Sequence, residues 1–404
     1  MATKKMLSGD NKPNWPKLLT GGIAVALVAG LFLFNLGGFL PASPSERLTF
    51  AQAGSLSAII NDPLQLPYKL LAFALMHLPG NDLLYTRFAS VLVTCLGVWL
   101  FYKTARRWYG LTTAFWSTAL FATSTWTVQS GRFGTSYSLL LVMVLALINL
   151  AAWINSKQNE GRALVAFATV AGLSLFVSGG LWFVLATILL LYKPLLELRQ
   201  TASPKQLSLA AGIFLGCFAV AAASLLRKPE LLTAWIGLPS TAFPGFVAIA
   251  KQAVFSILYF VLKGPAMPEI WLAHTPLLDV ASTVFLVFGV VFYSRHLTNP
   301  RTRLLAAFTL IGVVMVAIRG AVALQYLVPA VYLVAGGGMA YFLHQWKKVF
   351  PSNPVARIVS TGLVFVLLAC IVSFHAQRYF VAWRYSPATV EAYYGPKPVS
   401  DTIK

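Results

Sequence analysis

The side chains of this chain that could act as bases, acids or metal ligands are few enough to consider singly. Only 11 of 404 residues are Asp or Glu. Carboxylates serve as general bases and as ligands of hard cations. Those between apolar segments on the predicted outer side are Glu46, Asp62, Asp82, Glu230, Glu269, Asp279, Glu391 and Asp401. Almost none lies in the middle of an apolar segment, where proton-driven carriers keep their relays. This placement argues against such a carrier and favours chemistry at the outer surface.

A metal site built by the protein is not expected. Hard cations take several oxygen ligands, and here Glu46 or Asp62 would have to serve almost alone. No cofactor is predicted either, although a divalent ion bridged by a lipid phosphate is an alternative. The histidines are isolated rather than spaced as ligands, so packing or interfacial roles are expected for His77, His274, His344 and His375.

The elements that must position these side chains are transmembrane helices. The chain is 58% hydrophobic and only 10% charged, whereas soluble domains carry about a quarter charged residues. About 20 apolar residues cross the hydrocarbon core as a helix. The sequence predicts an all-α polytopic membrane protein with about 11 spans, near 18–40, 84–102, 109–128, 134–154, 163–178, 180–192, 206–225, 275–294, 303–319, 321–343 and 357–375. The segments 163–178 and 180–192 are short, and one broken or re-entrant hairpin is the alternative there.

The basic residues predict the orientation of these spans. The formal net charge is +20, but Lys and Arg gather between alternate spans, as the positive-inside rule requires of cytoplasmic loops. This distribution disfavours nucleic acid as a partner and favours the lipid bilayer. We therefore expect a cytoplasmic tail over 1–17, a membrane domain over 18–375 and a short exterior tail over 376–404, in a multi-pass protein of the plasma membrane.

Two stretches on the predicted outer side are too polar, or too rich in proline, to span. The first, 41–83, contains helix-compatible segments at Arg47–Ile60 and Leu64–Leu78, which are expected to lie along the membrane surface. The second, 226–274, is predicted to form an exterior cap in which Phe246–Leu262 is an interfacial or re-entrant helix.

The order of motifs along the chain resembles a known family. The residues concerned are Pro44-Ser45-Glu46, Asp62 to Leu71, Pro79 to Asp82, Thr86 to Ser90, Tyr102 to Gly110, Ser130 to Gly134 and Gln325 to Pro329. Together they resemble the membrane-embedded GT-C glycosyltransferases, in the branch of the dolichyl-phosphate-mannose protein mannosyltransferases and the bacterial lipid A aminoarabinose transferases. The sequence departs from that family at Ser45, where an Asp usually precedes the glutamate.

The resemblance implies a GT-C-like fold and transfer of a sugar from a polyprenyl phosphate to an acceptor outside the membrane. A carboxylate would activate the acceptor hydroxyl, and cations would hold the departing phosphate. Glu46 would be the base, with Asp62 as a second catalytic candidate. The phosphate or the substrate would be bound by Arg87, Arg132, Lys69, Arg319, Tyr68 and Tyr326.

Each of these residues also has a purely structural interpretation. Glu46 could cap the helix that follows it, and Asp62 before Pro63 could end that helix in a turn. Arginines at span ends are ordinary interfacial anchors, and tyrosines commonly pack there. Two further functions therefore stay open: a lipid or polysaccharide flippase, and a degenerate GT-C-like scaffold without activity.

Overall fold

The fold is entirely helical over the residues that the structure describes. This computed structural model describes residues 28–155, 160–239, 243–350 and 353–395, and no strand occurs among them. The predicted tail 1–17 and the start of the first span lie outside the described residues. The predicted all-α architecture is confirmed.

Among the described residues, five helices are both long and apolar enough to cross a membrane alone. They are α5 (Asp82–Tyr109), α8 (Tyr137–Ile154), α12 (Pro204–Arg227), α16 (Pro300–Arg319) and residues Gly362–Trp383, which include most of α18 (Pro354–Gln377). A sixth span results if α10 (Gly180–Leu190) and α11 (Tyr192–Thr201), bent by 76°, count as one. The other predicted spans lie over α6 (Leu111–Thr123), α7 (Thr125–Arg132), α9 (Glu160–Ser174), α15 (Val280–Ser294), the 3-10 turn η1 (Ala321–Tyr326) and α17 (Val328–Val349). The chain is a multi-pass helical membrane protein.

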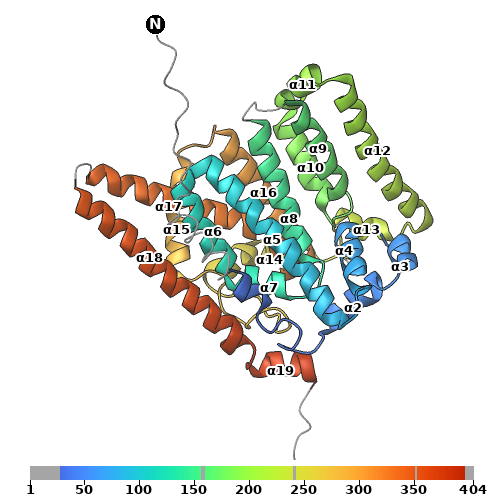
Figure 1. The fold of residues 1–404 in the computed structure, drawn as a ribbon, viewed down its shortest axis with the longest axis horizontal. Helices are drawn as coiled ribbons and strands as arrows, with labels where there is room; N and C mark the ends of the chain where they lie inside the picture. Colours follow the sequence, from blue (N-terminus) through green and yellow to red (C-terminus); the bar gives the residue numbers. More distant parts are fainter. Residues whose placement is uncertain (1–27, 156–159, 240–242, 351–352, 396–404) are drawn as a thin grey trace, which may run out of the picture.

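Short helices gather at one end of the bundle, which we call the surface-helix end. They are α2 (Pro44–Ala53), α3 (Leu56–Asn61), α4 (Leu66–Met76), α13 (Leu231–Ile236) and α19 (Pro387–Tyr394) (Figure 1). The predicted single helix 47–60 is wrong. Gly54 ends α2, and Ser55 starts α3 by accepting a hydrogen bond from the Ala58 N–H at 3.2 Å, as an N-cap serine does.

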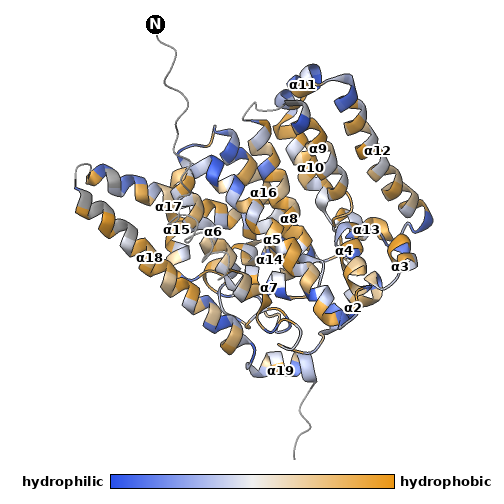
Figure 2. Cartoon of the chain, viewed as in Figure 1, coloured by the Kyte–Doolittle hydropathy of each residue, from blue (hydrophilic) through white to orange (hydrophobic). Residues whose placement is uncertain are grey.

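Burial separates central helices from peripheral ones. In the most apolar part of α8, 78% of the residues are buried, against 17% in α12. Figure 2 shows α12 along one margin of the bundle, largely hydrophobic along its length, with hydrophilic residues at its ends. Its apolar surface therefore faces lipid, whereas α8 forms the core with α5, against which it packs.

Two segments depart from the predicted arrangement. The predicted cap contains α14 (Phe246–Val261), which packs along α16 and leaves several of its large apolar side chains exposed (Figure 1). The last span was predicted to end at 375. The helix instead continues through Gln377 into the π-helical turn η2 (Arg378–Trp383). The chain then folds back in α19, which contacts the loop before α15 through the Tyr393 hydroxyl and the Glu269 carbonyl, 2.9 Å apart.

Glycines allow α15 and α17 to approach closely. A Cβ on Gly338 would lie 1.9 Å from the Phe285 carbonyl oxygen, and one on Gly289 would lie 2.0 Å from the Val334 carbonyl oxygen. Small residues at such crossings let helix backbones meet in membranes. The contact therefore depends on the absence of side chains at these two positions.

We expect Gly338→Ala to destabilise the protein by about 1–3 kcal/mol, the usual cost of overpacking. The added methyl group has no space unless one helix shifts. The measurement is the midpoint of thermal unfolding in detergent, which should fall.

Gly216→Ala on lipid-facing α12 is the matched control, because a Cβ there meets nothing within 4 Å. Alanine has the higher helix propensity, so this variant should unfold at the same temperature or higher. Equal behaviour of the two variants would refute the close-packing argument.

Candidate functional site

The buried carboxylate of Glu46 is the centre of the first predicted outer loop. Glu46 is the third residue of α2 and forms a capping box with Ser43, whose N–H donates to Glu46 Oε2 at 3.0 Å. Arg87 Nε donates to Oε1 at 2.8 Å, and Arg87 Nη2 donates to Oε2 at 2.9 Å. The Gly134 N–H also donates to Oε1, at 2.8 Å. Glu46 is fully buried, and each of its oxygens accepts two hydrogen bonds.

This arrangement, which we call the Glu46–Arg87 clamp, joins three distant segments. Besides binding Glu46, the Arg87 guanidinium donates to the carbonyl oxygens of Leu36 and Pro41, at 3.0 Å each. It thereby ties together the chain after the first described helix (residues 28–33, called the first helix below), the start of α2 and the N-terminal part of α5. Bidentate arginine–carboxylate pairs are the strongest hydrogen-bonded ion pairs in proteins. In this conformation four of the five Arg87 N–H groups are occupied.

Arg132 closes the end of the first helix. Its Nη1 donates to the carbonyl oxygens of Leu31 and Phe32, at 3.1 and 2.9 Å, and its Nη2 donates to that of Phe34 at 2.7 Å. The last carbonyls of a helix have no partner within it, so a cation is favoured there. Nε donates to the Tyr379 hydroxyl at 3.3 Å. Arg132 is therefore a helix cap in this conformation.

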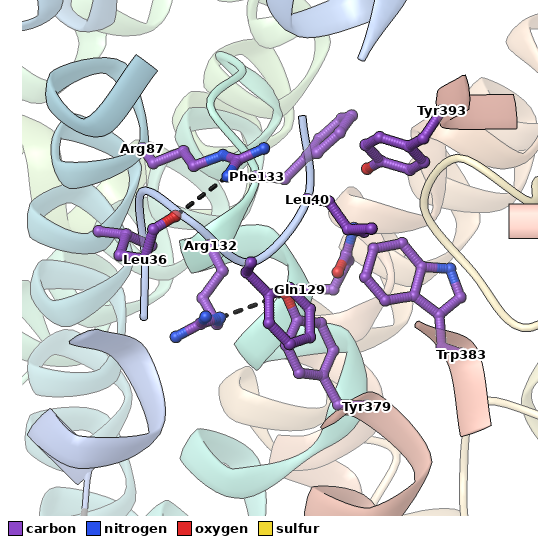
Figure 3. Close-up of a pocket in the computed structure, with 10 residues that line it drawn as sticks. Leu36, Leu40, Arg87, Gln129, Arg132, Phe133, Tyr379, Trp383 and Tyr393 are labelled. Carbon is purple, nitrogen blue, oxygen red and sulfur yellow. Dashed lines mark hydrogen bonds between the residues drawn. The ribbon is translucent and has the colours of Figure 1, made fainter. Parts of the chain in front are cut away.

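Arg87 and Arg132 line the same cavity, but it is too small for a sugar. Its volume of about 10 Å³ corresponds to a single water at most. Figure 3 shows the two arginines across from aromatic side chains of the C-terminal segment. The lining residues are Leu36, Phe39, Leu40, Arg87, Gln129, Arg132, Phe133, Tyr379, Trp383 and Tyr393. Glu46 pairs with Arg87 but does not itself line this cavity.

Asp62 and Lys69 pair with each other at the α3–α4 junction. Lys69 Nζ lies 2.8 Å from Asp62 Oδ2 and also 2.8 Å from the Asp62 carbonyl oxygen. Asp62 Oδ1 accepts from the Leu64 N–H at 3.2 Å, as in a turn. Burial lowers the pKa of Lys69 from its ordinary value, whereas its hydrogen bond to Asp62 and the charge of Asp62 act in the other direction. Lys69 is only 2% exposed, while Asp62 is 28% exposed.

The two tyrosines of the predicted site are buried and hydrogen-bonded. The Tyr68 hydroxyl lies 2.8 Å from Ser90 Oγ and donates to the Thr86 carbonyl at 3.0 Å, which fixes α4 against α5. The Tyr326 hydroxyl donates to the Ser178 carbonyl, in the turn between α9 and α10. Both therefore hold segments of the surface-helix end together.

Arg319 differs from the other two predicted arginines. It ends α16, is only half-buried, and donates from Nη1 to Ser178 Oγ at 2.7 Å. Its guanidinium also interacts with the Tyr326 hydroxyl. Within the described ranges, no carboxylate forms an ion pair with it. Arg319 is therefore the predicted arginine whose charge is available to a ligand.

A second carboxylate, Glu269, reaches α2 from the predicted cap. Its Oε1 accepts from the Ser45 N–H and its Oε2 from Ser45 Oγ, at 2.9 Å each. The Tyr137 hydroxyl interacts with Ser45 and lies within electrostatic reach of both Glu269 and Arg319. The Gln65 N–H donates to the Phe176 carbonyl at 2.6 Å, so the start of α4 lies beside the turn that contains Ser178. Ser45, Glu269, Tyr137 and Arg319 form what we call the Glu269 cluster.

Sequence reasoning did not find this cluster. Glu269 was recognised as an outer carboxylate, but 224 residues separate it from Ser45. Ser45 itself carried the only signal, because it stands where the related motif has an acidic residue. His375 has the packing role, one of the two that were expected for it, and is buried with its imidazole 3.2 Å from Asp279 Oδ2 and 2.7 Å from Thr125 Oγ1. Over the described residues, no three His, Cys, Asp or Glu side chains are grouped to hold a metal ion.

Glu46→Gln should unfold the protein at lower temperature, because it leaves the buried Arg87 guanidinium without its counter-charge. Breaking one partner of a buried pair costs about 3–5 kcal/mol. Thermal unfolding in detergent measures the effect. Glu391→Gln, at an exposed position of α19, removes a carboxylate without a pair and should leave the midpoint unchanged. An unchanged midpoint for Glu46→Gln would contradict the structural role of the clamp.

Comparison with known proteins identifies structures with a similar fold. No family model matches the sequence, and no curated protein matches it. Solved structures do match. The crystal structure of ArnT from Cupriavidus metallidurans in the apo state has a TM-score of 0.61 at 13% identity, covering 94% of this chain and 78% of that one. The same enzyme bound to undecaprenyl phosphate has a TM-score of 0.59 at 13% identity, covering 92% and 77%. ArnT is a lipid A aminoarabinose transferase and a GT-C glycosyltransferase. The predicted GT-C-like fold is thereby confirmed.

Proposed function

We propose that this protein is a membrane glycosyltransferase that takes a sugar from a polyprenyl phosphate donor and passes it to an acceptor at the surface-helix end. The observation that carries the proposal is the fold, which matches ArnT over 94% of the chain. One of the matching structures is bound to undecaprenyl phosphate, which supports a donor of this chemical class. The sugar and the acceptor are left unspecified.

The charges at the surface-helix end support a phosphate-linked donor. Arg319 is half-buried and without a carboxylate partner among the described residues. A guanidinium binds two phosphate oxygens at once and keeps its charge at any physiological pH. We assign Arg319 to the phosphate of the donor. Lys69, on neighbouring α4, is a second candidate once its bond to the partly exposed Asp62 is exchanged for one to the phosphate.

Arg87 and Arg132 are assigned a structural role rather than phosphate binding. Their N–H groups are already used by Glu46 and by backbone carbonyls. A phosphate could reach them only if the clamp opened and left Glu46 buried without its cation, which is costly. We therefore propose that Glu46, Arg87 and Arg132 position the first loop. Glu46 as the base stays a prediction that requires opening of the clamp.

Release of polyprenyl phosphate separates this function from its alternatives. The purified protein in detergent, given undecaprenyl phosphate-linked sugars and solubilised envelope lipids and glycans, should release undecaprenyl phosphate. A flippase would need a sealed bilayer and leave the donor intact. A scaffold would leave it intact under both conditions. Absence of release across a panel of hexose and pentose donors would refute the proposal.

Arg319→Gln should weaken binding of undecaprenyl phosphate about 10-fold to 100-fold, since hydrogen bonds to charged groups contribute about 1.5–3 kcal/mol. Arg319→Lys should recover part of this loss, because it keeps the charge without the fork. Binding of the lipid to the purified protein is the measurement.

Arg303→Gln is the control. Arg303 is exposed near the other end of α16, so this variant should bind undecaprenyl phosphate as the unchanged protein does. Equal affinities of Arg319→Gln and Arg303→Gln would remove Arg319 from the phosphate site.

A further inference from the structure

Resting on the proposed function, we propose that Glu269 is the base that activates the acceptor hydroxyl. The outer carboxylates of the described chain differ in how fully they are occupied. Glu46 accepts four hydrogen bonds, two of them from Arg87. Asp62 pairs with Lys69, and Asp279 pairs with His375. The exposed carboxylates of Asp82, Glu230 and Glu391 have no cationic partner either, but no contact connects them to the Glu269 cluster.

The Glu269 carboxylate is accessible to an acceptor and is held in a defined position. It is only partly buried, and the donors it meets are the N–H and hydroxyl of Ser45, which are neutral. Within the described ranges, no basic side chain pairs with it. A base must have an unblocked lone pair within hydrogen-bond reach of the proton it takes. Two neutral hydrogen bonds orient the carboxylate and leave lone pairs on both oxygens for an acceptor.

The backbone that carries Glu269 is held from three sides. The Tyr393 hydroxyl of α19 donates to the Glu269 carbonyl at 2.9 Å. The Trp383 indole N–H and the Thr389 hydroxyl donate to the Pro268 carbonyl, at 3.1 and 3.3 Å. Effective catalytic groups are fixed in advance by surrounding hydrogen bonds. The C-terminal segment therefore serves to position this carboxylate.

The cluster contains both a carboxylate and a guanidinium. Tyr137, the first residue of α8, interacts electrostatically with the Glu269 carboxylate and with the Arg319 guanidinium. Direct displacement of a phosphate needs a base on the acceptor side and a cation on the leaving-group side. Glu269 and Arg319 provide both at the surface-helix end.

The step balances without a metal or a cofactor. The acceptor O–H proton passes to a Glu269 oxygen while the acceptor oxygen forms a bond to the anomeric carbon of the sugar. The bond from that carbon to the phosphate oxygen breaks, and its electron pair leaves with the polyprenyl phosphate. Arg319 stabilises the negative charge that develops on the phosphate. The proton on Glu269 is then lost to water.

In Glu269→Gln the amide oxygen can still accept a hydrogen bond from Ser45, but the amide cannot take a proton from the acceptor. The variant should lower the maximal rate of undecaprenyl phosphate release about 100-fold or more, the usual contribution of a general base. Binding of undecaprenyl phosphate should be unchanged. Glu391→Gln, exposed on α19, should release it at the original rate.

Ser45→Ala provides an independent test through the split between turnover and binding. The variant removes the hydroxyl that orients the Glu269 carboxylate, so the maximal rate of undecaprenyl phosphate release should fall. Binding of undecaprenyl phosphate should be unchanged, because Ser45 is not assigned to the phosphate. This variant retains Glu269, and it tests the proposal even if Glu269→Gln does not fold.

The outcomes separate the two proposals. If the unchanged protein releases no undecaprenyl phosphate from any donor, the glycosyltransferase function fails, and the role of Glu269 fails with it. If the unchanged protein is active and Glu269→Gln matches it, or Ser45→Ala releases undecaprenyl phosphate at the original rate, only the role of Glu269 is overturned.

Discussion

The Glu46–Arg87 ion pair is the interaction on which the surface-helix end depends. Two charges are removed from solvent, and the cost is offset because the pair is bidentate and the remaining carboxylate lone pairs meet backbone N–H groups. Arg87 holds the chain after the first helix through Leu36 and Pro41. Through Ser43 and Gly134, the same carboxylate fixes the start of α2 and the turn before α8. These segments carry Ser45 and Tyr137, so the clamp determines where the Glu269 cluster forms.

The sequence motif suggested Glu46 as the base, whereas we propose a structural role for Glu46 and the role of base for Glu269. Glu46 is fully buried and bound by a cation, whereas Glu269 is partly exposed and bound by a serine. Proton transfer requires a group whose charged form is not locked in place by an opposite charge. Ser45, at the position where the GT-C motif that it resembles has an acidic residue, is neutral and places no like charge at hydrogen-bond distance from Glu269. The substitution at Ser45 is therefore compatible with activity, and the proposed catalytic carboxylate comes from another part of the chain.

The sequence predicted those parts of the fold that local patterns determine. Apolar runs of about 20 residues predicted α5, α8, α12 and α16. Such a run forms a helix in lipid because its backbone N–H and C=O groups must be hydrogen-bonded within the segment. Motif order along the chain predicted the GT-C-like fold and the proximity of Glu46 to Arg87. Contacts between distant segments outside these motifs could not be predicted. Neither the pairing of Ser45 with Glu269 nor the return of α19 onto the Pro268 carbonyl leaves a periodic or charge signal in the sequence. For the same reason Arg132 was expected at a phosphate, although it caps the first helix.

The position of α19 has a consequence for how the protein is made. The described helices of the membrane bundle precede it in the chain, and Tyr393, Thr389 and Trp383 hold the loop of Glu269 by hydrogen bonds. A nascent chain whose earlier helices have already been inserted would still lack these anchors. The loop of Glu269 therefore acquires its full set of hydrogen bonds only once α19 has been synthesised.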